Sequence, residues 1–260
     1  MTTATLEPVV DQAALFEFLV RIGDNALILG HRVSEWCGHA PALEEDIALA
    51  NTALDLIGQT QLWLGLAGEV EGKGRSADDL AYLRDGFEFR NILLVERPND
   101  DFGKTLMRQF LYDAWHYLLL KALKGSTDRR VAEIAEKAFK EVSYHLDRSR
   151  DLVIRLGDGT DESHCRMQEA LDDLWPYTGE MFVADAVDTR LAEAGVIPEP
   201  QSLKAGWDEI VADALAEGTL KKPADGYMHK GGRRGVHTEH LGFILTELQF
   251  LQRAYPGAVW

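Results

Sequence analysis

Apolar residues recur at helical spacing along most of the chain, and proline and glycine fall almost entirely between the apolar stretches. Side chains at positions i, i+3, i+4 and i+7 share one face of an α-helix, and Gly and Pro interrupt helices. The pattern therefore predicts seven main helices and no strand. They are expected at about 11–36, 43–70, 102–124, 128–156, 161 to the AGVIPEP segment at 194–200, 202–217 and 237–253.

The two N-terminal helices are longer than the ~10–14 residues usual for globular proteins. The first has one broad apolar face, formed by Leu15, Phe18, Leu19, Ile22, Ala26, Leu29 and Val33. For the second, the expected inner face consists of Ile47, Ala50, Leu54, Ile57, Gln61, Leu64 and Ala67. Both faces predict a buried interface.

Capping residues and helix breakers mark the connections. Ser76 predicts a short helix within the connection 72–103, which also contains a second apolar turn at 92–95. Thr127 or Asp128 is the expected N-cap of the fourth main helix. Pro176 predicts a kink within the fifth.

The helices expected at 11–36 and 43–70 form one pair, and those at 102–124 and 128–156 form another. Each pair is joined by a tight turn, and a long connection separates the pairs. This arrangement is typical of a four-helix bundle. We expect an all-α fold, a ferritin-like four-helix bundle with additional C-terminal helices. It should form a single ferritin-like helical domain over 1–260, with the core bundle at about 11–156 and the C-terminal helices at about 161–254.

The charge balance argues against nucleic-acid binding. Forty-three acidic and 27 basic residues give a formal net charge of −16, which repels phosphate backbones. Positive charge gathers only near GGRRG at 231–235, which follows Lys221, Lys222 and Lys230. No apolar run approaches the ~18 residues of a membrane span, and no signal peptide is evident, so we expect a soluble, cytoplasmic protein without a membrane partner.

A dimetal site is the main chemistry to look for in such a bundle. It needs one Glu from each of two helices and a Glu-x-x-His pair from each of the other two. On the second helix, where an Asp-Glu-x-x-His would stand, the sequence reads Asp55-Leu56-Ile57-Gly58-Gln59. Leu56 cannot bind a metal, and Gln59 is a weak substitute for imidazole.

The fourth main helix offers only part of a site. Glu141 has Tyr144 at i+3 and His145 at i+4, and the candidate partner carboxylates are Asp113 and Asp24. Because this set is incomplete, we predict that the chain holds no metal and no cofactor. The remaining carboxylates should be satisfied by a polar network. Its expected donors are Gln59, Arg108, Lys140, Tyr144 and His145.

Three long stretches then point to a family. Residues 29–63, 140–149 and 231–260 resemble, in the same order, the small ferritin-like subunit of phenylacetyl-CoA epoxidase complexes, and the similarity extends over essentially the whole chain. The resemblance implies a non-catalytic structural subunit that has lost its iron ligands. Its partner would be a homologous catalytic oxygenase subunit that holds a di-iron centre and epoxidises the aromatic ring of the coenzyme A thioester.

Two other functions remain open at this point. The chain could be a self-standing di-iron oxygenase or iron-handling protein, or a self-associating bundle without a catalytic partner. Metal content and co-purification distinguish these alternatives from the structural subunit. Alone, the chain can form homodimers, since a bare partner-binding face is an exposed apolar patch.

We expect the partner to bind at the second helix, at a helix-end corner and at the C-terminal tail. The corner consists of His31, Glu35 and Trp36, and the tail residues are Phe250, Tyr255 and Trp260. Such an aromatic chain end is costly to leave in water unless it docks. Docking on its own bundle is the alternative for the tail, and a helix-end hydrogen bond is the alternative for the His31–Glu35 pair.

Overall fold

The computed structural model describes residues 10–224 and 226–258. In this part of the chain there are ten α-helices, five short 3-10 helices and no strand. The predicted all-α fold is confirmed.

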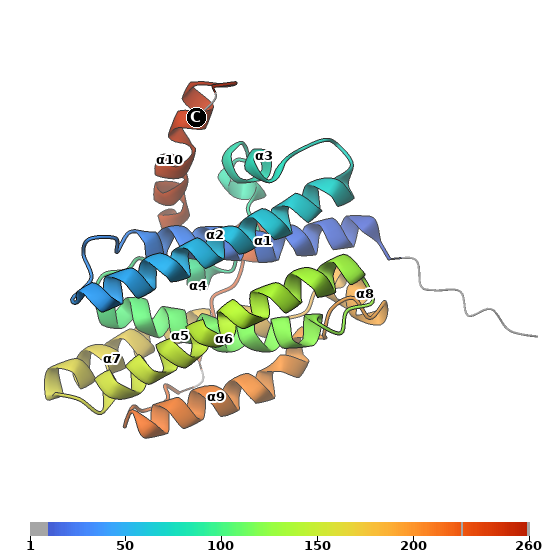
Figure 1. The fold of residues 1–260 in the computed structure, drawn as a ribbon. Helices are drawn as coiled ribbons and strands as arrows, with labels where there is room; N and C mark the ends of the chain where they lie inside the picture. Colours follow the sequence, from blue (N-terminus) through green and yellow to red (C-terminus); the bar gives the residue numbers. More distant parts are fainter. Residues whose placement is uncertain (1–9, 225, 259–260) are drawn as a thin grey trace, which may run out of the picture.

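Two hairpins of long helices form the bundle (Figure 1). They are α1 (Gln12–Ser34) with α2 (Leu43–Glu71), and α5 (Phe102–Leu123) with α6 (Arg129–Gly157). Asp11 caps α1 and Asp128 caps α6, each by accepting hydrogen bonds from backbone N–H groups of the first turn. The two pairs pack on each other, and the main apolar core lies between them.

The connection between the hairpins contains α3 (Ala77–Tyr82), η1 (Gly86–Glu88) and α4 (Leu93–Glu96). The predicted cap at Ser76 is present as a capping box with Asp79. The second apolar turn is α4, and its apolar side chains are buried.

The C-terminal part is more broken than the sequence predicted. The expected fifth helix ends after α7 (Asp161–Leu174) and gives way to η2 (Trp175–Tyr177), η3 (Gly179–Phe182) and a separate α8 (Ala186–Glu193). Pro176 lacks an N–H, and Asp185 starts α8 as a new N-cap, so the prediction of one kinked helix was wrong. η4 (Pro200–Leu203) and α9 (Lys204–Glu217) follow.

The predicted inner face of α2 was also partly wrong. Leu64 and Ala67 are buried, but Ile47 and Leu54 are 54% and 66% exposed. The buried row instead includes Leu49, Ala53, Leu56, Gln59 and Trp63. Apolar residues occur nearly all round this helix, so their spacing alone does not select the buried face.

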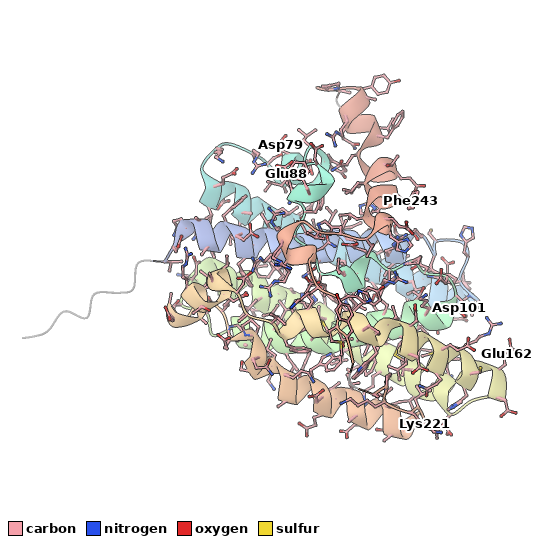
Figure 2. The ribbon with its side chains drawn as sticks, turned by 180° about the vertical axis from the view of Figure 1, so that it is seen from behind. Asp79, Glu88, Asp101, Glu162, Lys221 and Phe243 are labelled. Carbon is pink, nitrogen blue, oxygen red and sulfur yellow. The ribbon has the colours of Figure 1, made fainter. Side chains whose placement is uncertain are left out.

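The last helix, α10 (Glu239–Ala254), projects from the body of the bundle (Figures 1 and 2). It packs on α3 and η1 through Leu241, Ile244, Leu245 and Gln249. Phe243 lies on its outer side and is 68% exposed. Before it, η5 (Gly232–Arg234) is fixed against the N-terminal half, where Gly232 packs directly on the Asn91 carbonyl.

Candidate functional site

The inward-facing i, i+3 pairs of α2 and α6 decide whether a metal can bind between them. On α2 the pair is Leu56 and Gln59, both buried. On α6 it is Val142 and His145, also both buried, whereas Tyr144 is 57% exposed. The inward pair on α6 therefore begins at Val142 and not at Glu141, so each helix has an aliphatic side chain where a dimetal protein needs a carboxylate.

Two contacts join the polar groups of α2 and α6. Gln59 Nε2 donates to Glu141 Oε2 at 2.9 Å, and His145 Nε2 lies 2.9 Å from Asp55 Oδ2. The His145 side chain is almost completely buried, but that of Asp55 is 37% exposed. Asp55 and Glu141 thus lie along the seam between the two helices, where an imidazole and an amide are their partners.

Asp113 on α5 is fully buried. Its carboxylate accepts hydrogen bonds from Gln109 Nε2 at 2.7 Å and Ser149 Oγ at 2.8 Å. Burial raises the pKa of Asp113 to about 6, and these hydrogen bonds and the nearby His145 oppose that rise. The side chain is held by neutral donors in a low-dielectric environment.

His116 belongs to the same core and was not among the predicted residues. It follows Asp113 at i+3, is fully buried, and neither ring nitrogen has a hydrogen-bond partner among the described residues. Burial lowers its pKa to about 3, so the ring is neutral, and it packs on Tyr112 with the ring centres 5.0 Å apart. The Asp113-x-x-His116 spacing was the sequence signal that could have identified it.

Asp24 lies apart from this cluster. It is paired with Arg84, and its Oδ2 accepts from Arg90 N at 2.8 Å. Its role is to join α1 to the connection between the hairpins. The expectation that Asp24 and Asp113 share one site does not fit this geometry.

Three expected donors to the core also lie elsewhere, among them Tyr144, which is 57% exposed on α6. Arg108 is fully buried, but it donates to the Arg97 carbonyl and to Asn99 Oδ1. Lys140 is exposed on α6.

The residues present do not fit a dimetal centre. Within residues 10–224 and 226–258, no three His, Cys, Asp or Glu side chains gather closely enough to hold a metal ion. Leu56 and Val142 remove two of the four carboxylates that such a centre requires. Of the remaining polar groups, Gln59 donates to Glu141, His145 contacts Asp55, and Gln109 and Ser149 both donate to Asp113.

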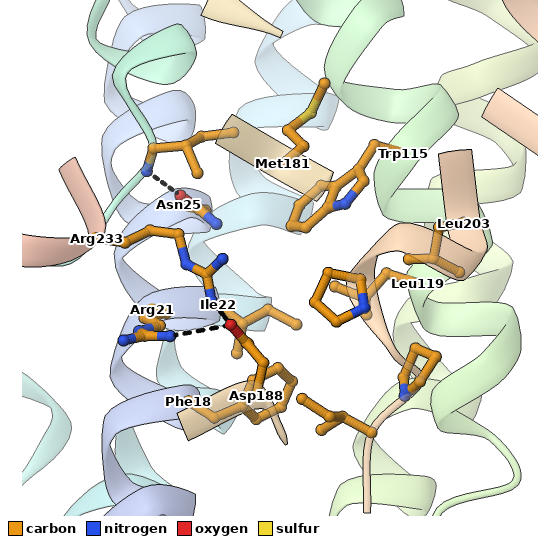
Figure 3. A pocket seen from close by; sticks show the side chains of 14 residues that line it. Phe18, Arg21, Ile22, Asn25, Trp115, Leu119, Met181, Asp188, Leu203 and Arg233 are labelled. Carbon is orange, nitrogen blue, oxygen red and sulfur yellow. Dashed lines mark hydrogen bonds and ion pairs between the residues drawn. The ribbon is translucent and has the colours of Figure 1, made fainter. Parts of the chain in front are cut away.

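A small cavity of about 50 Å³ opens between α1 and α5 (Figure 3). Phe18, Ile22 and Leu119 give it mainly apolar walls. At its edge, the Asp188 carboxylate is paired with both Arg21 and Arg233. This buried ion cluster joins α1, α8 and η5.

The residues of the predicted corner at the end of α1 mostly contact other residues of the same chain. Glu35 accepts from Arg32 Nη1 at 2.9 Å, and the Trp36 indole N–H donates to Thr105 Oγ1 at 2.8 Å. Trp36 also packs edge-on against Phe102. His31 is half-buried, and burial lowers its pKa.

The predicted tail residues are more open. Phe250 and Tyr255 are 62% and 58% exposed, and Trp260 lies outside the described residues. The second helix, where the partner was also expected to bind, carries a further exposed apolar surface, although Ile47 and Leu54 had been assigned to its inner face. This surface is formed by Leu43, Ile47 and Leu54 on α2, with Tyr144 on the neighbouring α6, and we call it the α2–α6 face.

No described helix is long and apolar enough to cross a membrane. A family model described as "Phenylacetic acid catabolic protein" matches residues 1–260. The chain is also similar to a protein of Escherichia coli (strain K12) that is named as one of the subunits of 1,2-phenylacetyl-CoA epoxidase. The two are 47% identical over 246 residues, which cover 95% of this chain and 99% of that protein.

Proposed function

Because the chain belongs to the phenylacetic acid catabolic protein family, we propose that it is a non-catalytic structural subunit of a multicomponent bacterial oxygenase. In this proposal the complex epoxidises phenylacetyl-CoA in aerobic phenylacetate catabolism. The catalytic partner is a homologous subunit with a di-iron centre, and this chain stabilises it. The observation that supports the structural role is the pair Leu56 and Val142, buried where a dimetal protein has carboxylates.

The alternative of a self-standing di-iron protein lacks a donor set in the described core. In the proposed complex, iron bound in the catalytic partner would activate oxygen there. The residues of this chain have a different task, because Gln59, Ser149 and Gln109 satisfy carboxylates through hydrogen bonds. Such a core keeps the bundle folded without a metal.

The α2–α6 face is the best candidate for the partner contact. Leu43 and Leu54 are 72% and 66% exposed on α2, and Tyr144 is 57% exposed on α6, which contacts α2. In Figure 1, α2 and α6 lie together on the near side of the bundle. Exposed apolar side chains that cluster on a long, regular helix are typical of protein interfaces.

Co-expression with the catalytic subunit tests this proposal. Leu54→Lys and Ile47→Lys place a charge in the proposed interface, so we expect each to reduce co-purification by about tenfold or more. Val183→Lys is the matched control, because Val183 is 54% exposed on another part of the surface. Full recovery of the complex with both α2 variants would refute this interface.

Metal analysis tests which of the two subunits holds the iron. The purified chain should contain well under one iron per molecule, and iron in the complex should follow the amount of catalytic subunit. Close to two irons in the isolated chain would favour the self-standing di-iron alternative.

A further inference from the structure

The cavity of about 50 Å³ between α1 and α5 lies apart from the residues that carry the proposed function (Figure 3). Side chains of the bundle form one wall, and side chains that follow η2 in the chain form the other. The bundle contributes Phe18, Ile22, Trp115 and Leu119, and the C-terminal part contributes Met181, Ile197, Pro198, Pro200 and Leu203. The cavity is therefore mainly apolar and lies where the C-terminal part packs on the bundle.

The charged groups at the edge of the cavity are paired with one another. Arg21 donates to the two carboxylate oxygens of Asp185, at 3.2 Å and 2.7 Å. Asp188 accepts from Arg233 Nη2 at 2.7 Å and from Asp185 N at 2.9 Å. A charged guest would have to break these pairs and would lose its own hydration in the cavity, so the arrangement favours an uncharged guest.

Asn25 on α1 offers a hydrogen-bond donor to the cavity. The residue is only 3% exposed, and its Oδ1 accepts from Ile92 N at 2.8 Å. A backbone N–H can bond only to the oxygen of the amide, so this contact fixes the orientation of the amide group. Figure 3 shows the amide nitrogen pointing toward the cavity, and no hydrogen bond among the described residues uses it. Asn25 Nδ2 is therefore a fixed donor without a partner in the described chain.

The volume of the cavity limits its guest to a few atoms. A water molecule needs about 10–15 Å³ of such space, whereas benzene fits an apolar cavity of about 150 Å³. A cavity of about 50 Å³ holds about three or four non-hydrogen atoms and excludes an aromatic ring. Water alone fits it poorly, because a buried water molecule makes about three hydrogen bonds and the apolar walls supply none.

We propose that this cavity binds a small uncharged molecule with one carbonyl or hydroxyl oxygen, which is a short-chain ketone, aldehyde or alcohol. The oxygen accepts from Asn25 Nδ2. The hydrocarbon part contacts Ile22, Leu119 and Met181. One fixed polar group within apolar walls is typical of small-molecule sites. Because the guest contacts both walls, its binding stabilises the attachment of the C-terminal part to the bundle.

Acetone is a suitable probe, since it is small and uncharged and has one carbonyl oxygen. Its binding to the full-length chain can be followed by NMR through the methyl signals of Leu119 and Met181 in the cavity walls. We expect saturable binding with a Kd of about 1 mM, which is reasonable for so small a ligand. At about ten times this concentration, the melting temperature should rise by about 2 °C. Acetophenone carries the carbonyl on an aromatic ring and should not bind.

Variants separate the donor from the apolar walls. Asn25→Asp keeps the oxygen that accepts from Ile92 N but, when ionised at pH 8, cannot donate. It should weaken acetone binding by about tenfold and leave the binding of xenon, which has no acceptor, within about twofold. Leu119→Phe fills the cavity and should abolish binding of both. Asn51→Asp and Leu83→Phe make the same substitutions at exposed positions and are the matched controls.

The proposal is refuted if acetone causes no saturable shift at Leu119 and Met181, or if acetophenone binds as tightly as acetone. Equal affinity losses in Asn25→Asp and Asn51→Asp would also overturn it, and this comparison decides the matter if Leu119→Phe does not fold. A crystal structure that shows only water beside Asn25 in the presence of acetone would assign the cavity to solvent. These measurements use the chain alone, so a negative result leaves the proposed structural role in place.

Discussion

At the residue scale, aliphatic side chains occupy core positions where a dimetal protein has carboxylates. Leu56 and Val142 contribute apolar packing where carboxylates would otherwise need a cation. Asp113 keeps its carboxyl group but has neutral donors, and a buried charge without a counter-ion costs free energy. The ionised Asp113 carboxylate therefore lowers the free energy of unfolding.

Asp113→Asn should stabilise the fold at pH 7. The pKa of Asp113 is about 6 in the folded chain and about 3.9 in an unfolded one, so folding favours the protonated form. The free energy of unfolding should therefore fall as pH rises from about 4 to about 6, and the variant should remove this loss. We expect a gain of about 3 kcal/mol at pH 7 that disappears below pH about 4.

Urea unfolding across this pH range measures the effect. Asp151→Asn is a suitable control, because Asp151 is an exposed carboxylate on the same α6 helix that supplies Ser149. A less stable Asp113→Asn protein at pH 7 would mean that the ionised carboxylate is favourable in the core, through His145.

His237 should make stability fall with rising pH as well, but in a higher range. Burial opposes its protonation, but the hydrogen bond and charge of Glu96 prevail and raise its pKa. A raised folded pKa gives stability that is fully present below the unfolded value of about 6.5 and is lost as pH rises through the folded pKa. His237→Gln should remove this decline in urea unfolding above pH about 6.5, whereas exposed His39→Gln should keep it. An unchanged profile in His237→Gln would assign the decline to another group.

At the element scale, the sequence predicted the helices better than their orientation. Asp11, Ser76 and Asp128 cap the expected helices, because a capping side chain acts on its own first turn. The face of α2 could not be chosen, since Ile47 and Leu54 are as apolar as the residues that are buried. Only packing against α1 and α6 distinguishes the two sides.

The core site was predictable only in part, for the same reason. The absence of a ligand at Leu56 follows from the residue type alone. The sequence does not show which side of α6 faces the core. Successive residues of a helix point about 100° apart, so a shift of one residue decides whether Glu141 or Val142 points inward. The Asp113-x-x-His116 spacing could have pointed to His116, but the sequence does not show that its ring is buried without a hydrogen-bond partner among the described residues.

Removal of residues 255–260 should weaken partner binding without unfolding the bundle. Tyr255 follows the end of α10 and is 58% exposed, so its loss costs the described core little packing. We expect an unchanged cooperative melt by circular dichroism and reduced co-purification with the catalytic subunit. Undiminished co-purification would leave the α2–α6 face as the proposed contact. A lowered melting temperature would show that the tail docks on its own bundle.

At the scale of the whole molecule, two forces act in opposite directions on self-association. The net charge of −16 makes copies of the chain repel one another, whereas the α2–α6 face favours contact through Leu43, Leu54 and Tyr144. Charge repulsion is screened by salt, but apolar contact is not. The balance between monomer and dimer should therefore depend on ionic strength.

We expect the isolated chain to form homodimers through the α2–α6 face, and to do so more strongly as salt is added. Sedimentation velocity at about 0.02 M and about 0.3 M salt should show more dimer at the higher concentration, because screening shortens the range of repulsion. Leu54→Lys should favour the monomer at both concentrations. Added catalytic subunit should also dissociate the homodimer, since both partners would use the same face. Dimers that weaken with salt would indicate an interface of ion pairs, and homodimers that bind the catalytic subunit intact would place the two contacts on different surfaces.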